Sequence, residues 1–269
     1  MTAQIPKRII QTDASAELAP LPKASAVGLR LLHPSFEYLF FDDAQVNRFI
    51  DSEFPQYRLI FDTFPFRIQR YDFFRYLAVY HYGGFYFDTD ILLSSSVDDL
   101  LKFGCVFPFE KLTIHDYLVD KYGMDWEVGN YAFGAAAGHP FLKAVIDNCI
   151  LGHQNPEYVK DMTDTIPRVF RREMFVLAAT GPGLVSRTLA EYRRSGDPVE
   201  ILFPDDVRDE KSWFCFGTYG IHLQAGTWRR RKNLMHRVSE RYWESWKQKA
   251  RSRDSWKRGP KRSLEFESI

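Results

Sequence analysis

Besides its opening Arg70, the largely apolar stretch RYDFFRYLAVYHYGGFYFDTDILL (residues 70–93) contains four charged residues at fixed spacings. Asp72 and Arg75 are three residues apart, a spacing that places both on one face of a helix. Asp88 and Asp90 are two residues apart, which places both on one face of a strand. Because a charge in apolar surroundings costs free energy unless it is paired, each of the four requires a partner in the protein or in a ligand.

Two carboxylates at the carboxyl end of a strand are a plausible site for a divalent cation. In an open α/β sheet this end faces the crevice where ligands bind. A cation there would neutralise a diphosphate and stabilise it as a leaving group. The spacing of Asp72 and Arg75 leaves two alternatives open: a buried ion pair that holds the fold, or a pair that reaches a polar ligand. Because Asp-x-Asp alone is short enough to occur by chance, the prediction depends on the residues around it.

The elements that must position these charges follow from the hydrophobic pattern. Residues 67–82 contain no helix breaker and are apolar on two opposite faces, which predicts a buried helix. Gly83 and Gly84 predict the end of that helix. FYFD (residues 85–88) is typical of a short buried strand. The two pairs of charges should therefore be joined by a helix, a glycine turn and a strand.

Strands and helices alternate from the start of the chain, which favours an α/β fold with a mainly parallel central sheet flanked by helices. Asp42 and Asp43 are expected to cap one of these helices. We expect a domain over residues 1–230 and a basic tail over residues 231–269, helical to about residue 250 and flexible beyond. Further strands are predicted at residues 7–11, 36–41, 105–109, 130–136, 199–203 and 212–223, and further helices at 44–52, 140–151 and 181–194.

The charge of the chain is unevenly distributed. Residues 229–262 contain 14 Lys or Arg against 3 Asp or Glu, which leaves a net charge of −10 for the rest. This asymmetry predicts an anionic partner for the tail, and the acidic body argues against nucleic acid. Leu234, Val238, Tyr242 and Trp246 form a stripe among basic residues. Such a helix suits either an anionic membrane surface or packing against the domain, and both alternatives stay open.

Composition and cysteine use indicate a cytoplasmic protein. Hydrophobic residues make up 45% and charged residues 26% of the chain, as in soluble globular proteins. Cys105, Cys149 and Cys215 have no metal-ligand spacing, and an odd number of cysteines does not suggest a disulfide framework. We see no signal peptide and no apolar stretch near the ~20 residues that span a bilayer. The expected location is cytoplasmic, with peripheral attachment at the inner face of the membrane if the tail binds there.

The block Arg-Tyr-Asp-x-x-Arg-Tyr-x-x-x-Tyr-x-x-Gly-Gly-x-Tyr-x-Asp-x-Asp (residues 70–90) resembles the sugar-binding region of glycosyltransferases with a DXD motif, and within them family 32. IPKRIIQT (5–12), NYAFGAAAGHPF (130–141), ATGPGLV (179–185) and IHLQAGTW (221–228) are similar to further segments of that family. The chain departs from the family pattern by having Ile10 in place of a His and by lacking a Trp after Thr12. The resemblance covers about residues 5–230.

This resemblance implies a GT-A fold, a UDP- or GDP-hexose donor, a divalent metal (Mn²⁺ or Mg²⁺) and retention of anomeric configuration. It implies a glycan or lipid-linked acceptor and a role in surface polysaccharide or glycolipid synthesis. Carried over by position, Asp88, Asp90 and His222 would bind the metal, and Asp72 and Arg75 would bind the donor sugar. The other residues implied near the donor are Gln11, Thr12, Tyr86, Asp88, Asp125, Asn130, Thr227 and Trp228.

Two rival functions remain. In a phosphohydrolase of the haloacid-dehalogenase type, Asp88 would be the nucleophile and Asp90 the acid/base. The phosphohydrolase hypothesis leaves Asp72 and Arg75 unexplained. In addition, Leu92 stands where the phosphohydrolase motif has Thr or Val. A non-catalytic carbohydrate-binding protein with the same fold is the second rival, and the intact set of four charges argues against it.

Overall fold

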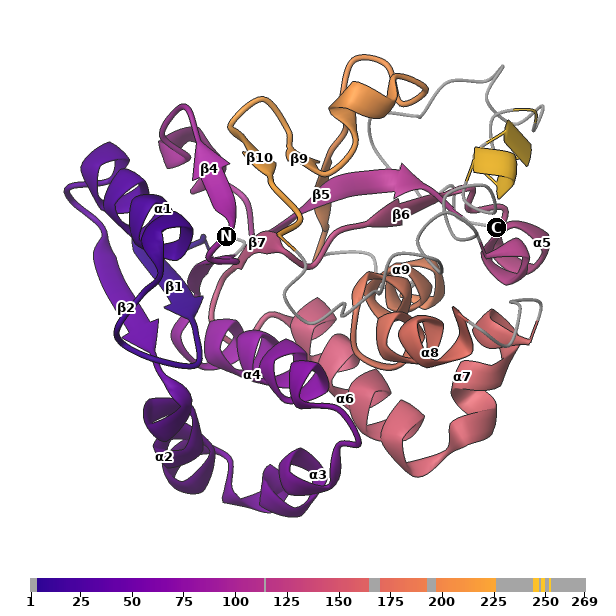
Figure 1. Cartoon of the computed structure of the whole chain (residues 1–269), viewed down its shortest axis with the longest axis horizontal. Coiled ribbons are helices and arrows are strands. Elements are labelled where there is room, and N and C mark those ends of the chain that lie inside the picture. The colour runs from indigo at the N-terminus through magenta and orange to yellow at the C-terminus, as the bar shows by residue number, and fades with distance from the viewer. Residues whose placement is uncertain are drawn as a thin grey trace.

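A mixed β-sheet with strand order β2-β1-β3-β7-β5-β6 runs through the computed structural model, and β8 pairs with β5 (Figure 1). The structure describes residues 4–113, 115–164, 170–192, 197–225, 244–246, 248–249 and 252. A smaller sheet has the order β4-β10-β9. The strands are β1 (Arg8–Thr12), β2 (Glu37–Phe41), β3 (Gly84–Phe87), β4 (Ile91–Leu93), β5 (Cys105–Leu112), β6 (Trp126–Val128), β7 (Ala132–Ala135), β8 (Glu200–Leu202), β9 (Cys215–Phe216) and β10 (Gly220–His222).

The α/β class predicted from the sequence is confirmed. Strand β1 is parallel to both β2 and β3, so the first strands of the chain have the predicted direction. Strand β8 is also parallel to its neighbour β5. Strand β7 adds a feature that the pattern did not predict, because it lies antiparallel to both β3 and β5.

Alternate side chains of the strands fill two hydrophobic cores, one on each face of the large sheet. Ile10 and Tyr86 belong to the core that contains α4 and α6 side chains. Ile9 and Phe85 belong to the other, which includes Leu29 of α1. The helices are α1 (Pro20–Leu32), α2 (Asp43–Glu53), α3 (Arg58–Thr63), α4 (Arg67–Tyr82), α5 (Asp116–Tyr122), α6 (Pro140–Gln154), α7 (Pro156–Thr163), α8 (Arg171–Ala179) and α9 (Pro182–Glu191).

Two local signals in the sequence fix helix ends as predicted. The Asp42 side chain accepts a hydrogen bond from the Gln45 amide at 2.8 Å, and the Gln45 side chain accepts one from the Asp42 amide at 3.0 Å, which starts α2 with a capping box. Helix α4 ends at Gly83, whose φ of 65° favours glycine. Gly84 follows with a φ of 109° and begins β3.

The described part of the tail lies against the domain. Trp246 is buried and packs with Phe170 and Met174. The Nζ atom of Lys249 lies 3.0 Å from Asp116. These contacts agree with the packing alternative for the tail, while the rest of the predicted apolar stripe and the boundary at residue 230 lie outside the described residues. Over the described ranges, none of the helices combines the length and apolarity that crossing a membrane requires. The cytoplasmic location and membrane attachment stay predictions.

Gly84 should be essential to the fold in a way that Gly123 is not. A Cβ atom at Gly84 would lie 2.7 Å from the Arg8 carbonyl oxygen, whereas at Gly123, with a φ of +64°, nothing lies within 4 Å. We therefore expect Gly84→Ala to lower the free energy of unfolding by about 3 kcal/mol or more, and Gly123→Ala by about 1 kcal/mol. Urea unfolding of the two variants measures both, and equal losses would contradict the proposed backbone contact.

Candidate functional site

A cleft of about 1450 Å³ opens where β1 and β3 end, between these strand ends and helices α4 and α8. Its lining includes the four charges singled out from the sequence: Asp72, Arg75, Asp88 and Asp90. The position at the carboxyl ends of two parallel strands is the one where open α/β sheets bind ligands.

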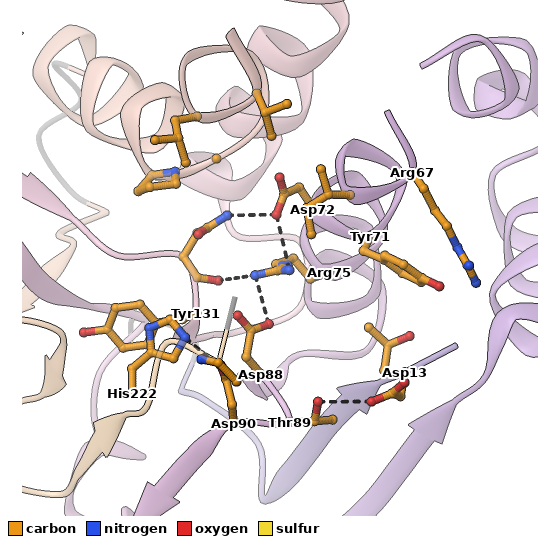
Figure 2. Close-up of a pocket in the computed structure, with 18 of the residues that line it drawn as sticks. Asp13, Arg67, Tyr71, Asp72, Arg75, Asp88, Thr89, Asp90, Tyr131 and His222 are labelled. Atoms are coloured by element: carbon orange, nitrogen blue, oxygen red, sulfur yellow. Dashed lines mark hydrogen bonds and ion pairs between the residues drawn. The ribbon is translucent and has the colours of Figure 1, made fainter. Parts of the chain in front are cut away.

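Arg75 is the centre of the charged cluster (Figure 2). Its Nη2 atom lies 3.2 Å from Asp72 Oδ1, and its Nη1 atom lies 3.1 Å from Asp88 Oδ1. Nη1 also donates to the Asn130 carbonyl at 2.9 Å, and the guanidinium lies 4.7 Å from the centre of the Tyr86 ring. Asp72 and Arg75 therefore form the buried ion pair of the first alternative, and they also line the cleft, where the second alternative would place a ligand.

Burial sets the acidity of the two carboxylates that share Arg75. It raises the pKa of Asp72 to about 6, although Arg75 and the Thr180 hydroxyl act in the opposite direction. It also raises the pKa of Asp88, against the opposing charge of Arg75. The Tyr86 hydroxyl donates a 2.7 Å hydrogen bond to Asp88 Oδ1. Burial lowers the pKa of Arg75, but Asp88 and the neighbouring acidic groups outweigh it, so that pKa is raised overall.

Asp88, Asp90 and His222 form a group whose ligand atoms all lie within 4.8 Å of one another. The register of β10 against β4 places His222 opposite Ile91, next to Asp90, and His222 Nε2 lies 3.2 Å from Asp90 Oδ1. The His222 ring stacks on Tyr131 with ring centres 4.4 Å apart. Carboxylates suit both Mn²⁺ and Mg²⁺, and an imidazole as the third ligand favours Mn²⁺ because Mg²⁺ prefers oxygen ligands, so the residues present fit the predicted metal.

Hydrogen bonds keep Asp90 ionised beside the second carboxylate. Burial raises its pKa, but the hydrogen bond with His222 and that from the Ala225 amide to Oδ2, at 2.9 Å, outweigh burial and lower the pKa overall. A deprotonated carboxylate is the form that a divalent cation binds.

The structure places Gln11, which was predicted near the donor, behind the cleft. Its side chain is fully buried and does not line the cleft. Its amide donates to the Asp88 carbonyl and to Ser25 Oγ, each at 3.3 Å, and accepts from the Tyr38 hydroxyl at 2.8 Å. Gln11 thus anchors the backbone of the DXD motif to β1.

The other predicted donor residues divide into three groups. Thr12, Tyr86 and Asn130 line the cleft. Asp125 does not line the cleft. It lies just before β6, and its backbone carbonyl accepts a hydrogen bond from the Thr113 amide at 2.9 Å. Thr227 and Trp228 lie outside the described residues.

Several lining residues were missed by sequence reasoning. Asp13 accepts a 3.2 Å hydrogen bond from the hydroxyl of Thr89, the middle residue of the DXD motif (Figure 2). Its position two residues after the predicted strand 7–11 could have identified it, by the rule that places ligand-binding carboxylates at the carboxyl ends of strands. Others, among them Phe66, Tyr71, Tyr131 and Arg172, gave no such signal.

Comparisons with known proteins show which sequences and folds this chain is similar to. Residues 26–107 match the family described as "Glycosyltransferase sugar-binding region containing DXD motif". Inositol phosphoceramide mannosyltransferase 2 of Schizosaccharomyces pombe is 32% identical over 220 residues, which cover 79% of this chain and 56% of that protein. Mannosyl phosphorylinositol ceramide synthase CSH1 of Saccharomyces cerevisiae is 27% identical over 200 residues, which cover 72% and 46%.

A solved structure shows the shared fold. The structure titled "PaToxG Glycosyltransferase" has a TM-score of 0.51 at 14% identity and covers 70% of each chain, and it confirms the predicted GT-A class. The chain spans about half the length of the curated relatives named above. Its matched DXD region and its sequence similarity make it a member of the glycosyltransferases with a DXD-containing sugar-binding region, the family 32 type.

Proposed function

We propose that this glycosyltransferase is a retaining, metal-dependent hexosyltransferase that uses a UDP- or GDP-hexose. The observation that carries the proposal is the Arg75 cluster, which joins Asp72, the predicted sugar-binding residue, to Asp88 of the metal group. A nucleotide sugar has the same two parts, a hexose and a diphosphate, directly bonded to each other. The names of the relatives favour mannose as the hexose.

Each part of the donor has matching groups in the cleft. A Mn²⁺ or Mg²⁺ ion held by Asp88, Asp90 and His222 would stabilise the charge that develops on the leaving diphosphate. Asp72 and Arg75 would accept from and donate to the hydroxyls of the hexose. Thr12 lies at the end of β1, where the nucleotide would bind.

The pairing of Asp72 and Asp88 favours same-face displacement over a covalent intermediate on either of these two residues. Asp72 and Asp88 both pair with Arg75 and accept further hydrogen bonds, so neither is set up as a nucleophile. The same bonds argue against the phosphohydrolase reading of Asp88. In same-face displacement the bond from the anomeric carbon to the phosphate breaks, the acceptor oxygen bonds that carbon on the same face, and the phosphate oxygen takes the acceptor proton. A hexose trapped covalently on any carboxylate would overturn this mechanism.

The cleft wall formed by α4 and α8 fits an acceptor with an apolar part and an anionic part. Phe66, Phe170 and Leu177 supply apolar surface. The Arg172 guanidinium lies 4.7 Å from the centre of the Phe66 ring, and the side chain is exposed in the cleft. Figure 2 places Arg67 across the pocket from Asp90 and His222. We infer an acceptor lipid with a phosphodiester headgroup on this wall, which the relatives' names also favour.

Loss of one metal carboxylate should abolish most of the turnover. We expect Asp90→Asn to lower kcat by about 10²–10³-fold and EDTA to abolish activity, because the charge of the leaving diphosphate is then unmatched. Release of GDP or UDP from GDP-mannose, UDP-glucose, UDP-galactose and UDP-N-acetylhexosamines, with Mn²⁺, measures this. Asp147→Asn, on the exposed side of α6, is the control and should match the parent. If Asp90→Asn turns over the donor as fast as the parent does, the proposal is wrong.

The activity should decline in mild acid. Because the pKa of Asp72 is raised to about 6, its carboxylate takes up a proton as the pH falls through that value and no longer pairs as an anion with Arg75. We expect kcat/KM for the donor to fall about tenfold per pH unit below pH 6. The decline should persist when Mn²⁺ is raised further above saturation, which separates it from protonation of the metal ligands. A profile that stays flat to about pH 5 would contradict the assignment to Asp72.

Arg172 should matter for charged acceptors only. We expect Arg172→Ala to raise KM for inositol phosphoceramide in detergent about tenfold or more, since a hydrogen bond to a charged group is lost. KM for the donor and transfer to neutral octyl mannoside should not change. Arg171→Ala is the matched control, because the neighbouring Arg171 does not line the cleft and donates to the Asp164 carbonyl. An equal loss with both acceptors would exclude an anion site at Arg172.

A further inference from the structure

The Thr-Gly-Pro turn between α8 and α9 has no part in the sugar, metal and acceptor assignments above. Gly181 and Pro182 line the cleft, whereas Thr180 is fully buried behind it. A Cβ atom on Gly181 would lie 2.9 Å from Leu177 Cα, so the turn folds back tightly on α8. This tight return brings Thr180 to α4, 108 residues earlier in the chain.

Thr180 belongs to a closed ring of hydrogen bonds around Asp72. Its hydroxyl donates to Asp72 Oδ2 at 2.9 Å, and its carbonyl accepts from the Tyr76 hydroxyl at 2.7 Å. The Asn130 side-chain amide donates to the Tyr76 hydroxyl at 2.8 Å and to Asp72 Oδ1 at 3.2 Å. The ring joins α4, the segment before β7 and the Thr-Gly-Pro turn, and all four residues are buried.

The ring leaves one acceptor position of Asp72 for a ligand. An ionised carboxylate has about four lone-pair positions, two on each oxygen. Asn130 and Arg75 occupy both positions on Oδ1, and Thr180 occupies one on Oδ2. Counting only partners in the described ranges, the remaining position is on Oδ2. Because Asp72 lines the cleft, this oxygen would accept a hydrogen bond from a hydroxyl of the donor sugar.

The charge of Asp72 does not by itself require this ring. Arg75 already provides the opposing charge within 3.2 Å. What Arg75 cannot fix alone is the rotation of the carboxylate about the Cβ–Cγ bond, for which Asp has a broad preference. The Thr180 hydroxyl could turn toward the Val176 carbonyl, 3.4 Å away, but the nearer and charged Asp72 oxygen is the stronger acceptor.

We propose that Thr180 and Tyr76 are positioning residues. They hold Asp72 Oδ2 in the orientation in which it accepts a hydrogen bond from a hydroxyl of the donor sugar. Neither residue lines the cleft, so neither touches the donor, and they act through Asp72. The inference rests on the proposed function for the identity of the ligand as a nucleotide sugar. A displacement of about 1 Å in such a group can cost about 10²-fold in rate.

The test compares Thr180→Val, which removes the hydroxyl at constant shape, with Thr180→Ser, which retains it. The matched control is Thr188→Val: the Thr188 hydroxyl is equally buried, donates to the Leu184 carbonyl at 2.8 Å and lies away from the cleft. With the donor that the parent turns over fastest, we expect Thr180→Val to lower kcat about 10- to 100-fold. Thr180→Ser should restore it to within about threefold of the parent, and Tyr76→Phe should lose less than Thr180→Val.

Binding measurements separate this inference from the proposed function, because they do not require turnover. Calorimetry with Mn²⁺ gives the affinities for GDP and GDP-mannose, and for UDP and UDP-glucose. Thr180→Val should bind the nucleotides as the parent does and lose the affinity that the sugar adds. In an Asp72→Asn background Thr180→Val should cause no further loss of sugar affinity. The inference is wrong if Thr180→Val behaves like Thr188→Val, or if its loss is unchanged in that background.

Discussion

The buried guanidinium of Arg75 is the constraint on which the site depends. A cation with only 5% of its side chain exposed must be matched by nearby anions, and here Asp72 and Asp88 share it. Removal of either anion would leave part of a buried charge unpaired, a change that typically costs about 3–5 kcal/mol. Helix α4 and the end of β3 are therefore held together by the same group that faces the ligand.

The geometry of helices and strands explains why the two pairs of charges meet. From Arg75 to Tyr82 the helix advances about 10 Å, at 1.5 Å per residue. After the glycine turn the chain reverses, and β3 returns about 13 Å between Gly84 and Asp88, at 3.3 Å per residue. The return matches the advance, so Asp88 arrives beside Arg75. The reversal requires glycine at position 84, because the backbone there passes too close to Arg8 for a side chain to fit.

Features that depend on residues close together in the sequence could be predicted, whereas contacts between residues far apart in the sequence could not. Helix α4, its glycine end and the α2 cap are encoded within a few residues, and they were predicted correctly. His222 came from the family resemblance alone. For Gln11 the position near the end of β1 does not reveal that its side-chain amide contacts Ser25 and Tyr38 instead of lining the cleft. Thr180 meets Asp72 only through the packing of α8 and α9 on α4, which no local pattern encodes.

The raised pKa of Asp72 implies that its ionised form costs the fold some stability at neutral pH. Its pKa in the fold is about 6, above the ordinary value of 3.8, so the folded protein binds this proton more tightly than the unfolded chain. The free energy of unfolding therefore falls as the pH rises from about 4 to about 6, and above that range the fold carries an ionised carboxylate at a cost. Asn130 and Thr180 favour the ionised form, the state in which Asp72 can only accept hydrogen bonds, as a hydroxyl donor requires.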